Sequence, residues 1–148
     1  MVHALEEVRR LLKSTGVLID MHPVAESLPM EIQQGEKIDP AGRLSIIQWI
    51  TDYQQADIAL AEIKQRGIFV VERESIFDAP TYYDSVEEMS THLKQSIDKF
   101  ARDPEWAARD ISQEDALAMR AAELMQAAGS GAEVVLHERI HISRWRPT

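Results

Sequence analysis

The residues most suggestive of chemistry lie near the end of the chain, in the segment His137-Glu138-Arg139-Ile140-His141. Its H-E-x-x-H spacing is the one that zinc proteases use, with the two histidines as metal ligands and the glutamate as general base. The motif works on a helix, where side chains four residues apart share one face and lie about 6 Å apart. On a strand, with a rise of roughly 3.3 Å per residue, the two histidines would lie about 13 Å apart, and one zinc ion cannot bridge them.

The pattern of the surrounding segment favours a strand, because apolar and polar residues alternate along it. The apolar face would hold Val134, Leu136, Ile140 and Ile142, and the polar face would hold Glu133, His137, Arg139, His141 and Ser143. Only Val135 and Glu138 break the alternation. We therefore interpret the motif as the polar face of a C-terminal strand and expect no metal site there. A zinc metallohydrolase acting through His137, Glu138 and His141 is kept as an alternative function.

The composition of the whole chain limits its partners. The 148 residues include 16 lysines and arginines against 25 aspartates and glutamates, which gives a formal net charge of −9. We therefore expect no nucleic-acid partner and no membrane partner, since both present negative charge. No apolar stretch approaches the roughly 20 residues of a membrane span. The absence of cysteine excludes disulfides and thiolate metal sites, and it suits a reducing, cytoplasmic location.

Periodicity along the chain predicts alternating helices and strands in a single domain, residues 1–148. Apolar residues at helical spacing predict four helices, and runs of β-branched residues predict strands at 17–21, at 68–77 and at the C-terminus. The helices are predicted around residues 5–12, 56–63, 85–100 and 112–125. Between the first strand and the second helix, "MEIQ" and "RLSIIQW" could pair as a small hairpin. Ser85 and Glu88 have the spacing of a capping box.

Three segments together resemble the C-terminal half of class I S-adenosylmethionine-dependent methyltransferases, a Rossmann-like superfamily. "ALEEVRRLLKSTGVLIDMHP" is similar to that family's helix, glycine turn and fifth strand, although Ser14-Thr15-Gly16 stands where Pro-Gly-Gly is usual. "ADIALAEIKQRGIFVVERE" resembles the next helix and the sixth strand. "VVLHERIHISRWRP" resembles the seventh strand, which runs antiparallel between the other two. The resemblance implies an α/β fold: a partial Rossmann-like sheet with three main strands, the last antiparallel and central, flanked by helices, with a helical insertion over 78–130.

The family's cofactor site lies in the half that this chain lacks. It needs a glycine-rich turn between a strand and a helix, whereas Gly129-Ser130-Gly131 precedes a predicted strand. The resemblance thus implies a methyltransferase-related module that binds no cofactor and is not catalytic by itself. The alternative is a subunit or fragment of a small-molecule methyltransferase that binds S-adenosylmethionine once a partner supplies the missing half. A sheet divided in this way leaves 17–21 as a bare apolar edge, so we expect a homodimer or a partner chain.

Candidates for a substrate pocket follow from the predicted sheet. In open α/β sheets, ligands bind at the carboxyl ends of parallel strands. His22 follows the first predicted strand, and Tyr82 and Tyr83 follow the second. We expect these three residues to line a pocket for a small molecule, with His22 as a candidate acid–base group. No catalytic residue beyond this and no cofactor-binding residue is predicted.

Overall fold

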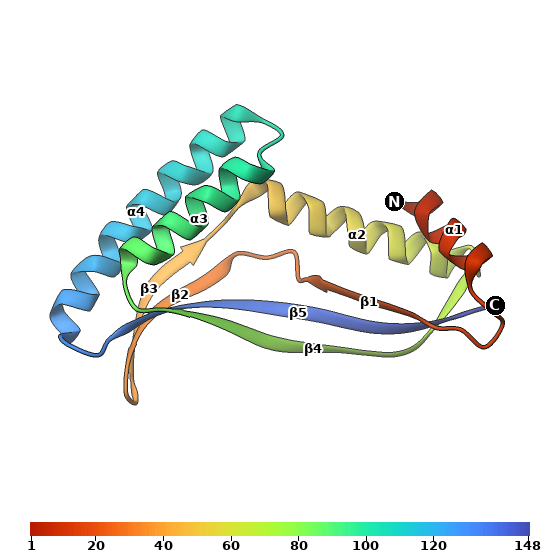
Figure 1. The fold of residues 1–148 in the computed structure, drawn as a ribbon, viewed down its shortest axis with the longest axis horizontal. Helices are drawn as coiled ribbons and strands as arrows, with labels where there is room; N and C mark the ends of the chain where they lie inside the picture. The colour runs from red at the N-terminus through yellow and green to blue at the C-terminus, as the bar shows by residue number, and fades with distance from the viewer. The chain divides into compact units, whose positions relative to one another are not determined.

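The computed structural model describes all residues, 1–148. In chain order the elements are α1 (Val2–Leu11), β1 (Leu18–Pro23), β2 (Leu28–Gln34), β3 (Lys37–Leu44), α2 (Ile47–Gln65), β4 (Phe69–Tyr83), α3 (Val86–Phe100), α4 (Pro104–Ala128) and β5 (Glu133–Pro147). Strand β5 pairs with β1, β2 and β4, and β2 also pairs with β3. The fold is therefore α/β, with an open, mostly antiparallel sheet of five strands and four helices (Figure 1).

The chain divides into two compact units, each assembled from separated segments. The first unit contains residues 1–25, 51–78 and 139–148, and the second contains residues 26–50 and 79–138. Helix α2 and the long strands β4 and β5 contribute residues to both units.

In the first unit, β1 pairs antiparallel with residues 140–145 of β5, and helices α1 and α2 supply the apolar cover. Its core contains Leu60, Ile63, Phe69 and Trp145. The apolar stripe of α1, expected from its periodicity, packs against this core through Val2, Leu5, Val8 and Leu12. The Trp145 indole donates a hydrogen bond to Ser143 Oγ over 2.7 Å, which satisfies its only buried polar group.

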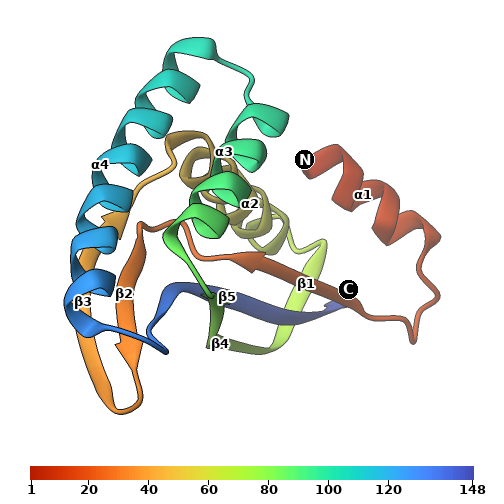
Figure 2. The same cartoon turned by 60° about the vertical axis from the view of Figure 1, so that its left-hand side comes forward.

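In the second unit, helices α3 and α4 pack against the hairpin β2–β3 and the first residues of β5. The two helices lie side by side (Figure 1), and α4 runs along β2 and β3 (Figure 2). The fully buried side chains include Met30, Ile32, Leu44, Met89 and Val134. Gly35, at a positive φ of 58°, lies in the tight turn between Gln34 and Lys37, which pair with one another. The resulting core is built from one face of the hairpin and the facing stripes of both helices.

Several element boundaries differ from those expected from the sequence. The hairpin is present, but its second strand is Lys37–Leu44, and the last three residues of "RLSIIQW", Ile47 to Trp49, begin α2. Helix α4 begins at Pro104 rather than Ser112, because the Asp103 carboxylate accepts hydrogen bonds from the amides of Glu105 and Trp106. The Ser85 cap is confirmed, since its hydroxyl accepts from the Glu88 amide over 3.1 Å. The strand expected at 68–77 extends to Tyr83.

Strand β5 confirms the strand prediction for the H-E-x-x-H segment, but only part of its predicted facing is right. In the second unit, Val134 and Leu136 are buried, as the alternation predicts, but Val135 between them is buried as well. In the first unit the odd-numbered residues Ser143 and Trp145 are the buried ones, at 1% and 3% exposure. The polar face expected at Ser143 therefore points to the core there, because Trp145 on the same face packs against α2 residues Leu60 and Ile63. This places His141 on the helix-covered face of its unit.

None of the four helices combines the length with the apolar character that a membrane span requires.

Candidate functional site

The candidate site is built on β1, which places His22 and Asp20 on one face. His22 was expected in a loop after the strand, but β1 continues through Pro23 and His22 lies inside it. In the antiparallel pairing of β1 with β5, His22 lies directly opposite His141. Successive side chains point to opposite faces of a strand, so Asp20 and His22 share one face and Ile19 and Met21 the other. The paired strands thus bring two histidines and a carboxylate together.

Both ring nitrogens of His22 lie within hydrogen-bond distance of a carboxylate. Nδ1 is 2.7 Å from Asp20 Oδ2, and Nε2 is 3.0 Å from Asp57 Oδ1. Asp57 comes from α2, and its side chain is about half exposed, whereas the His22 side chain is only 10% exposed. The imidazole is therefore fixed by one carboxylate from its own strand and one from the helix above it. Asp57 is the most exposed member of this set, since the Asp20 side chain is only 23% exposed.

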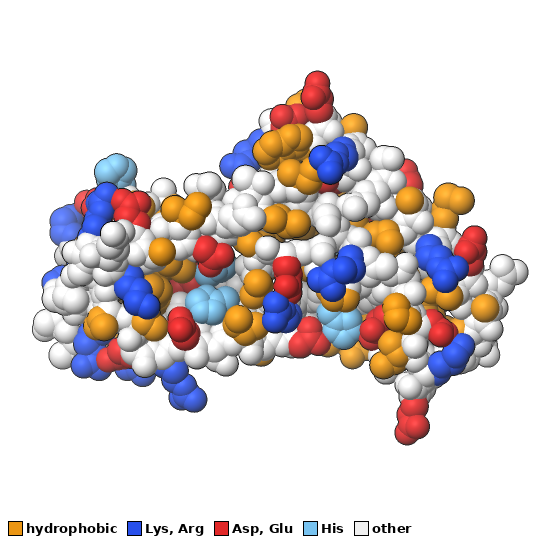
Figure 3. Space-filling view, turned by 180° about the vertical axis from the view of Figure 1, so that it is seen from behind, with side chains coloured by type: hydrophobic (Ala, Val, Ile, Leu, Met, Phe, Trp, Pro, Cys, Tyr) orange, Lys and Arg blue, Asp and Glu red, His pale blue; other side chains and the backbone are white.

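His141 completes the cluster from the neighbouring strand. Its ring meets the His22 ring edge-on, with the centroids 5.3 Å apart. Its Nε2 lies 3.8 Å from Glu74 Oε2 of β4, and the His141 side chain is about one-fifth exposed. One ligand atom from each of Asp20, His22 and His141 lies within 4.8 Å of the others. In the space-filling view of Figure 3, the histidine side chains that reach the surface have acidic side chains beside them.

This arrangement supports acid–base chemistry and the binding of a cation. A neutral imidazole has one N–H, so His22 can donate to both carboxylates only when its ring carries two protons. Three carboxylates, those of Asp20, Asp57 and Glu74, surround the two imidazoles. The cluster therefore offers negative charge to a bound group, together with a histidine positioned to give or accept a proton.

The other two pocket candidates, Tyr82 and Tyr83, lie in the second unit, at the end of β4. Tyr82 is exposed, at 53%, whereas Tyr83 is buried and shares a 2.8 Å hydrogen bond between its hydroxyl and Nδ1 of His92 on α3. Burial, and secondarily the carboxylate of Glu88, raises the pKa of the Tyr83 phenol above its ordinary value. Tyr83 is thus a buried, hydrogen-bonded member of the second core. His22 and the two tyrosines belong to different units, and their assignment to one pocket stays a prediction.

The members of the H-E-x-x-H motif have separate environments. His137 lies in the second unit, where its Nε2 is 2.9 Å from Glu31 Oε1 of β2. Burial raises the pKa of the Glu138 carboxyl above its ordinary value. His141 belongs to the first unit and to the cluster around His22. Since β5 is a strand, the helical geometry that gives this motif its zinc chemistry is absent.

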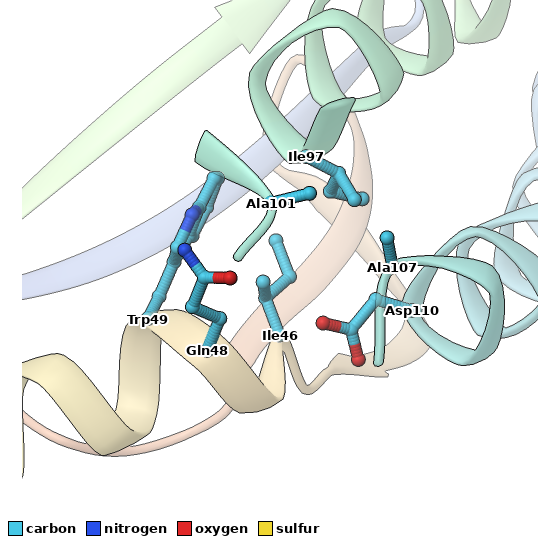
Figure 4. A pocket seen from close by; sticks show the side chains of 7 residues that line it. All are labelled: Ile46, Gln48, Trp49, Ile97, Ala101, Ala107 and Asp110. Atoms are coloured by element: carbon cyan, nitrogen blue, oxygen red, sulfur yellow. The ribbon is translucent and has the colours of Figure 1, made fainter. Parts of the chain in front are cut away.

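A small internal cavity lies in the second unit, where the start of α2 meets α3 and α4. Figure 4 shows its lining, which is Ile46, Gln48, Trp49, Ile97, Ala101, Ala107 and Asp110. Its volume of about 10 Å³ gives room for roughly one water molecule. The cavity is too small for a substrate. The polar side chains that line it bind backbone amides instead. Asp110 accepts a hydrogen bond from the Ile47 amide, and Gln48 accepts one from the Arg102 amide over 2.7 Å.

Sequence reasoning found His22 but missed Asp20, Asp57 and His141 as its neighbours. One signal was present, because Asp20 and His22 occupy alternate positions of an otherwise apolar run, which is unusual in a buried strand. Nothing in the sequence gave the register that sets His22 opposite His141, or the packing that brings Asp57 from α2.

The chain matches no protein-family model and no curated protein sequence.

Proposed function

We propose that this protein binds a small cationic or hydrogen-bond-donating molecule at the cluster of Asp20, His22, Asp57 and His141, with His22 as the acid–base group. The observation that carries the proposal is the placement of both His22 nitrogens against carboxylate oxygens, at 2.7 and 3.0 Å. Because the Asp57 side chain is about half exposed, a ligand can displace it from Nε2 without unfolding the strand pair. The displaced position is then occupied by the ligand, which can exchange a proton with His22.

The charge of the cluster selects the class of ligand. Three carboxylates face two imidazoles, and the chain as a whole carries a formal charge of −9. Anions such as phosphates or carboxylates are repelled by this set, whereas amines complement it. The partly buried position of Asp20 and His22 strengthens this selection, since charges are screened less there than on the surface.

Nuclear magnetic resonance of histidine ring signals tests the proposal directly. The metal-free protein is titrated with a panel of small amines and with carboxylates of matched size. We expect saturable shifts of the His22 and His141 ring signals with at least one amine, weakened in Asp57→Asn, and no response at His92. Equal response to both classes, or no response of the His22 ring to any amine, would overturn the proposal.

A second candidate function is the methyltransferase-related module, without methyl transfer in the isolated chain. The strand arrangement supports it, since β5 pairs with both β1 and β4 and runs antiparallel to β1, as the resemblance implies for the seventh strand. Strands β2 and β3, which pair on β5 beyond β1, are additions to that pattern. As part of this proposal, a second copy or a partner chain covers β1, whose Ile19 and Met21 are 53% and 64% exposed.

Calorimetric titration with S-adenosylmethionine and S-adenosylhomocysteine tests this second candidate. We expect no binding to the chain alone, and binding when a partner chain with the glycine-rich turn is added. Micromolar binding to the chain alone would contradict the prediction that this chain has no S-adenosylmethionine site of its own. No binding with any such partner, together with a monomer in light scattering, would remove the methyltransferase-related proposal.

A further inference from the structure

We propose that Asp20, His22 and His141 form a binding site for a divalent transition-metal ion. The inference rests on the same cluster as the proposed function, but it places the ion at His22 Nδ1, whereas the ligand of the proposed function takes the place of Asp57 at Nε2. One donor atom from each residue lies within 4.8 Å of the other two. Because donors around a metal lie about 2 Å from it, the donors of one site are about 3–4 Å apart, and a small side-chain adjustment closes this set.

The strand pairing gives these donors their common direction. His22 and His141 are direct partners in the antiparallel ladder, so their Cβ atoms lie roughly 5 Å apart on one face. Asp20 stands two residues before His22 and therefore faces the same way. His141 therefore has two histidines that could share a metal ion with it, one in its own strand and one in the neighbouring strand. Its partner in the sequence motif, His137, lies about 13 Å along the strand, whereas its partner across the ladder is in ring contact.

The donor types define the class of metal. Two imidazoles and one carboxylate suit Zn²⁺, Co²⁺, Ni²⁺ or Fe²⁺, whereas Ca²⁺ and Mg²⁺ prefer sites made of oxygen donors alone. Three protein ligands leave at least one coordination position for water or a substrate. The side chains of Asp20 and His141 are each about one-fifth exposed, so an ion can enter from solvent.

One further carboxylate, that of Asp57, stands where a ligand-orienting group is found in metal sites. Asp57 lies 3.0 Å from His22 Nε2, which leaves Nδ1, on the side of Asp20, to bind the ion. Glu74 also lies near His141, but at 3.8 Å from Nε2 it makes no hydrogen bond there. A carboxylate on the second ring nitrogen fixes the tautomer of a metal-binding histidine and raises its basicity. His22 Nδ1 is 2.7 Å from Asp20 Oδ2, so these two donor atoms already face the same position.

The test is titration of the chelator-treated, full-length protein with Zn²⁺ by calorimetry and with Co²⁺ by its ligand-field absorption. We expect one ion per chain with micromolar or tighter affinity. His141→Ala and Asp20→Asn should each weaken binding at least 100-fold, and Asp57→Asn should weaken it about 10- to 100-fold, as loss of a ligand-orienting carboxylate does. The matched control is His137→Ala, which removes a histidine of the same strand that pairs with Glu31, and it should leave binding unchanged. Circular dichroism establishes that each variant is folded.

Failure of the metal site and failure of the proposed function give different results. Absence of Zn²⁺ and Co²⁺ binding below 1 mM overturns the metal site. If amines still shift the His22 ring signals in that case, the proposed function stands without the metal. Binding that survives His141→Ala and is lost in His137→Ala would also overturn this assignment. Metal binding with the expected variant pattern supports the site whether or not amines bind.

Discussion

Replacing Asp110 with alanine should destabilise the second unit, because this side chain caps a helix to which it does not belong. Asp110 lies on α4 and is 2% exposed, and its carboxylate oxygens accept from the Ile47 amide at the start of α2, over 3.1 and 3.3 Å. The first amides of a helix have no partner within it. In Asp110→Ala, the Ile47 amide loses its acceptor, and the neighbouring cavity has room for only about one water in exchange.

The expected cost is about 0.5–2 kcal/mol, the range for removing a side chain that caps the first amides of a helix. Asp110→Asn is the matched control, since its amide oxygen still accepts, and it should cost less than about 1 kcal/mol. Urea unfolding followed by circular dichroism measures both values, and hydrogen exchange should show faster exchange of the Ile47 amide in the alanine variant alone. Equal costs for the two variants, or unchanged exchange at Ile47, would refute the capping role.

The pH dependence of the free energy of unfolding, compared between the wild type and Asp110→Asn, gives an independent check. Burial raises the pKa of the Asp110 carboxyl above its ordinary value of 3.8, and the backbone hydrogen bonds from α2 offset this only in part. The folded state therefore holds the proton more tightly than the unfolded state. The stability that this proton contributes is present below pH 3.8 and is lost as pH rises through the folded pKa. The stability of the wild type relative to Asp110→Asn should accordingly fall as pH rises through that window.

Three further predictions concern separate parts of the molecule. Met21→Lys, on the exposed face of β1, should reduce any self-association seen by light scattering, whereas Met119→Lys on the exposed face of α4 should not. Gly42→Ala should lower the free energy of unfolding, measured by urea unfolding, by about 1–3 kcal/mol. The φ of Gly42 is +150°, and a Cβ added there would lie 2.6 Å from Leu117 Cδ2. An unchanged free energy of unfolding would show that β3 can relax at this position. Glu138→Gln should flatten the pH profile of stability, because burial raises the pKa of the Glu138 carboxyl. In the wild type, the proton on this carboxyl stabilises the folded state below about pH 4.5, and this stabilisation is lost as pH rises through the folded pKa. An unchanged slope in that variant would contradict the assignment.

Local patterns in the sequence predicted which helices and strands form better than they predicted where these elements end or which of their residues are buried. The amphipathic stripe of α1 and the Ser85 cap are short-range features, and both are confirmed. The start of α2 depends instead on Asp110, more than sixty residues away, and no local pattern at Ile47 indicates it. The burial of β5 also changes along its length: three consecutive residues, 134–136, are buried, whereas further on only the alternate residues Ser143 and Trp145 are, and a single alternation rule cannot anticipate both.

The candidate site shows the same limit more sharply. His22 was identified from its position at the end of an apolar run, and that choice placed it near the right strand. Its chemistry, however, comes from His141, which the pairing register sets opposite it, and from Asp57, which helix packing brings above it. The distance in sequence between His22 and His141 spans most of the chain. Only the folded sheet shows that they are neighbours.

The interleaving of the two units has a consequence for how the protein is made. Residues 139–148 supply Trp145 to the first core and His141 to the cluster, while residues 1–25 of the same unit are synthesised first. Strand β1 therefore has no β5 residues to pair with until this segment has left the ribosome, after the second unit's residues 79–138 have been made. During that interval the apolar β1 is open to wrong pairing and to chaperones. Synonymous changes that slow translation near residue 139 would prolong this exposure and lower the yield of folded protein.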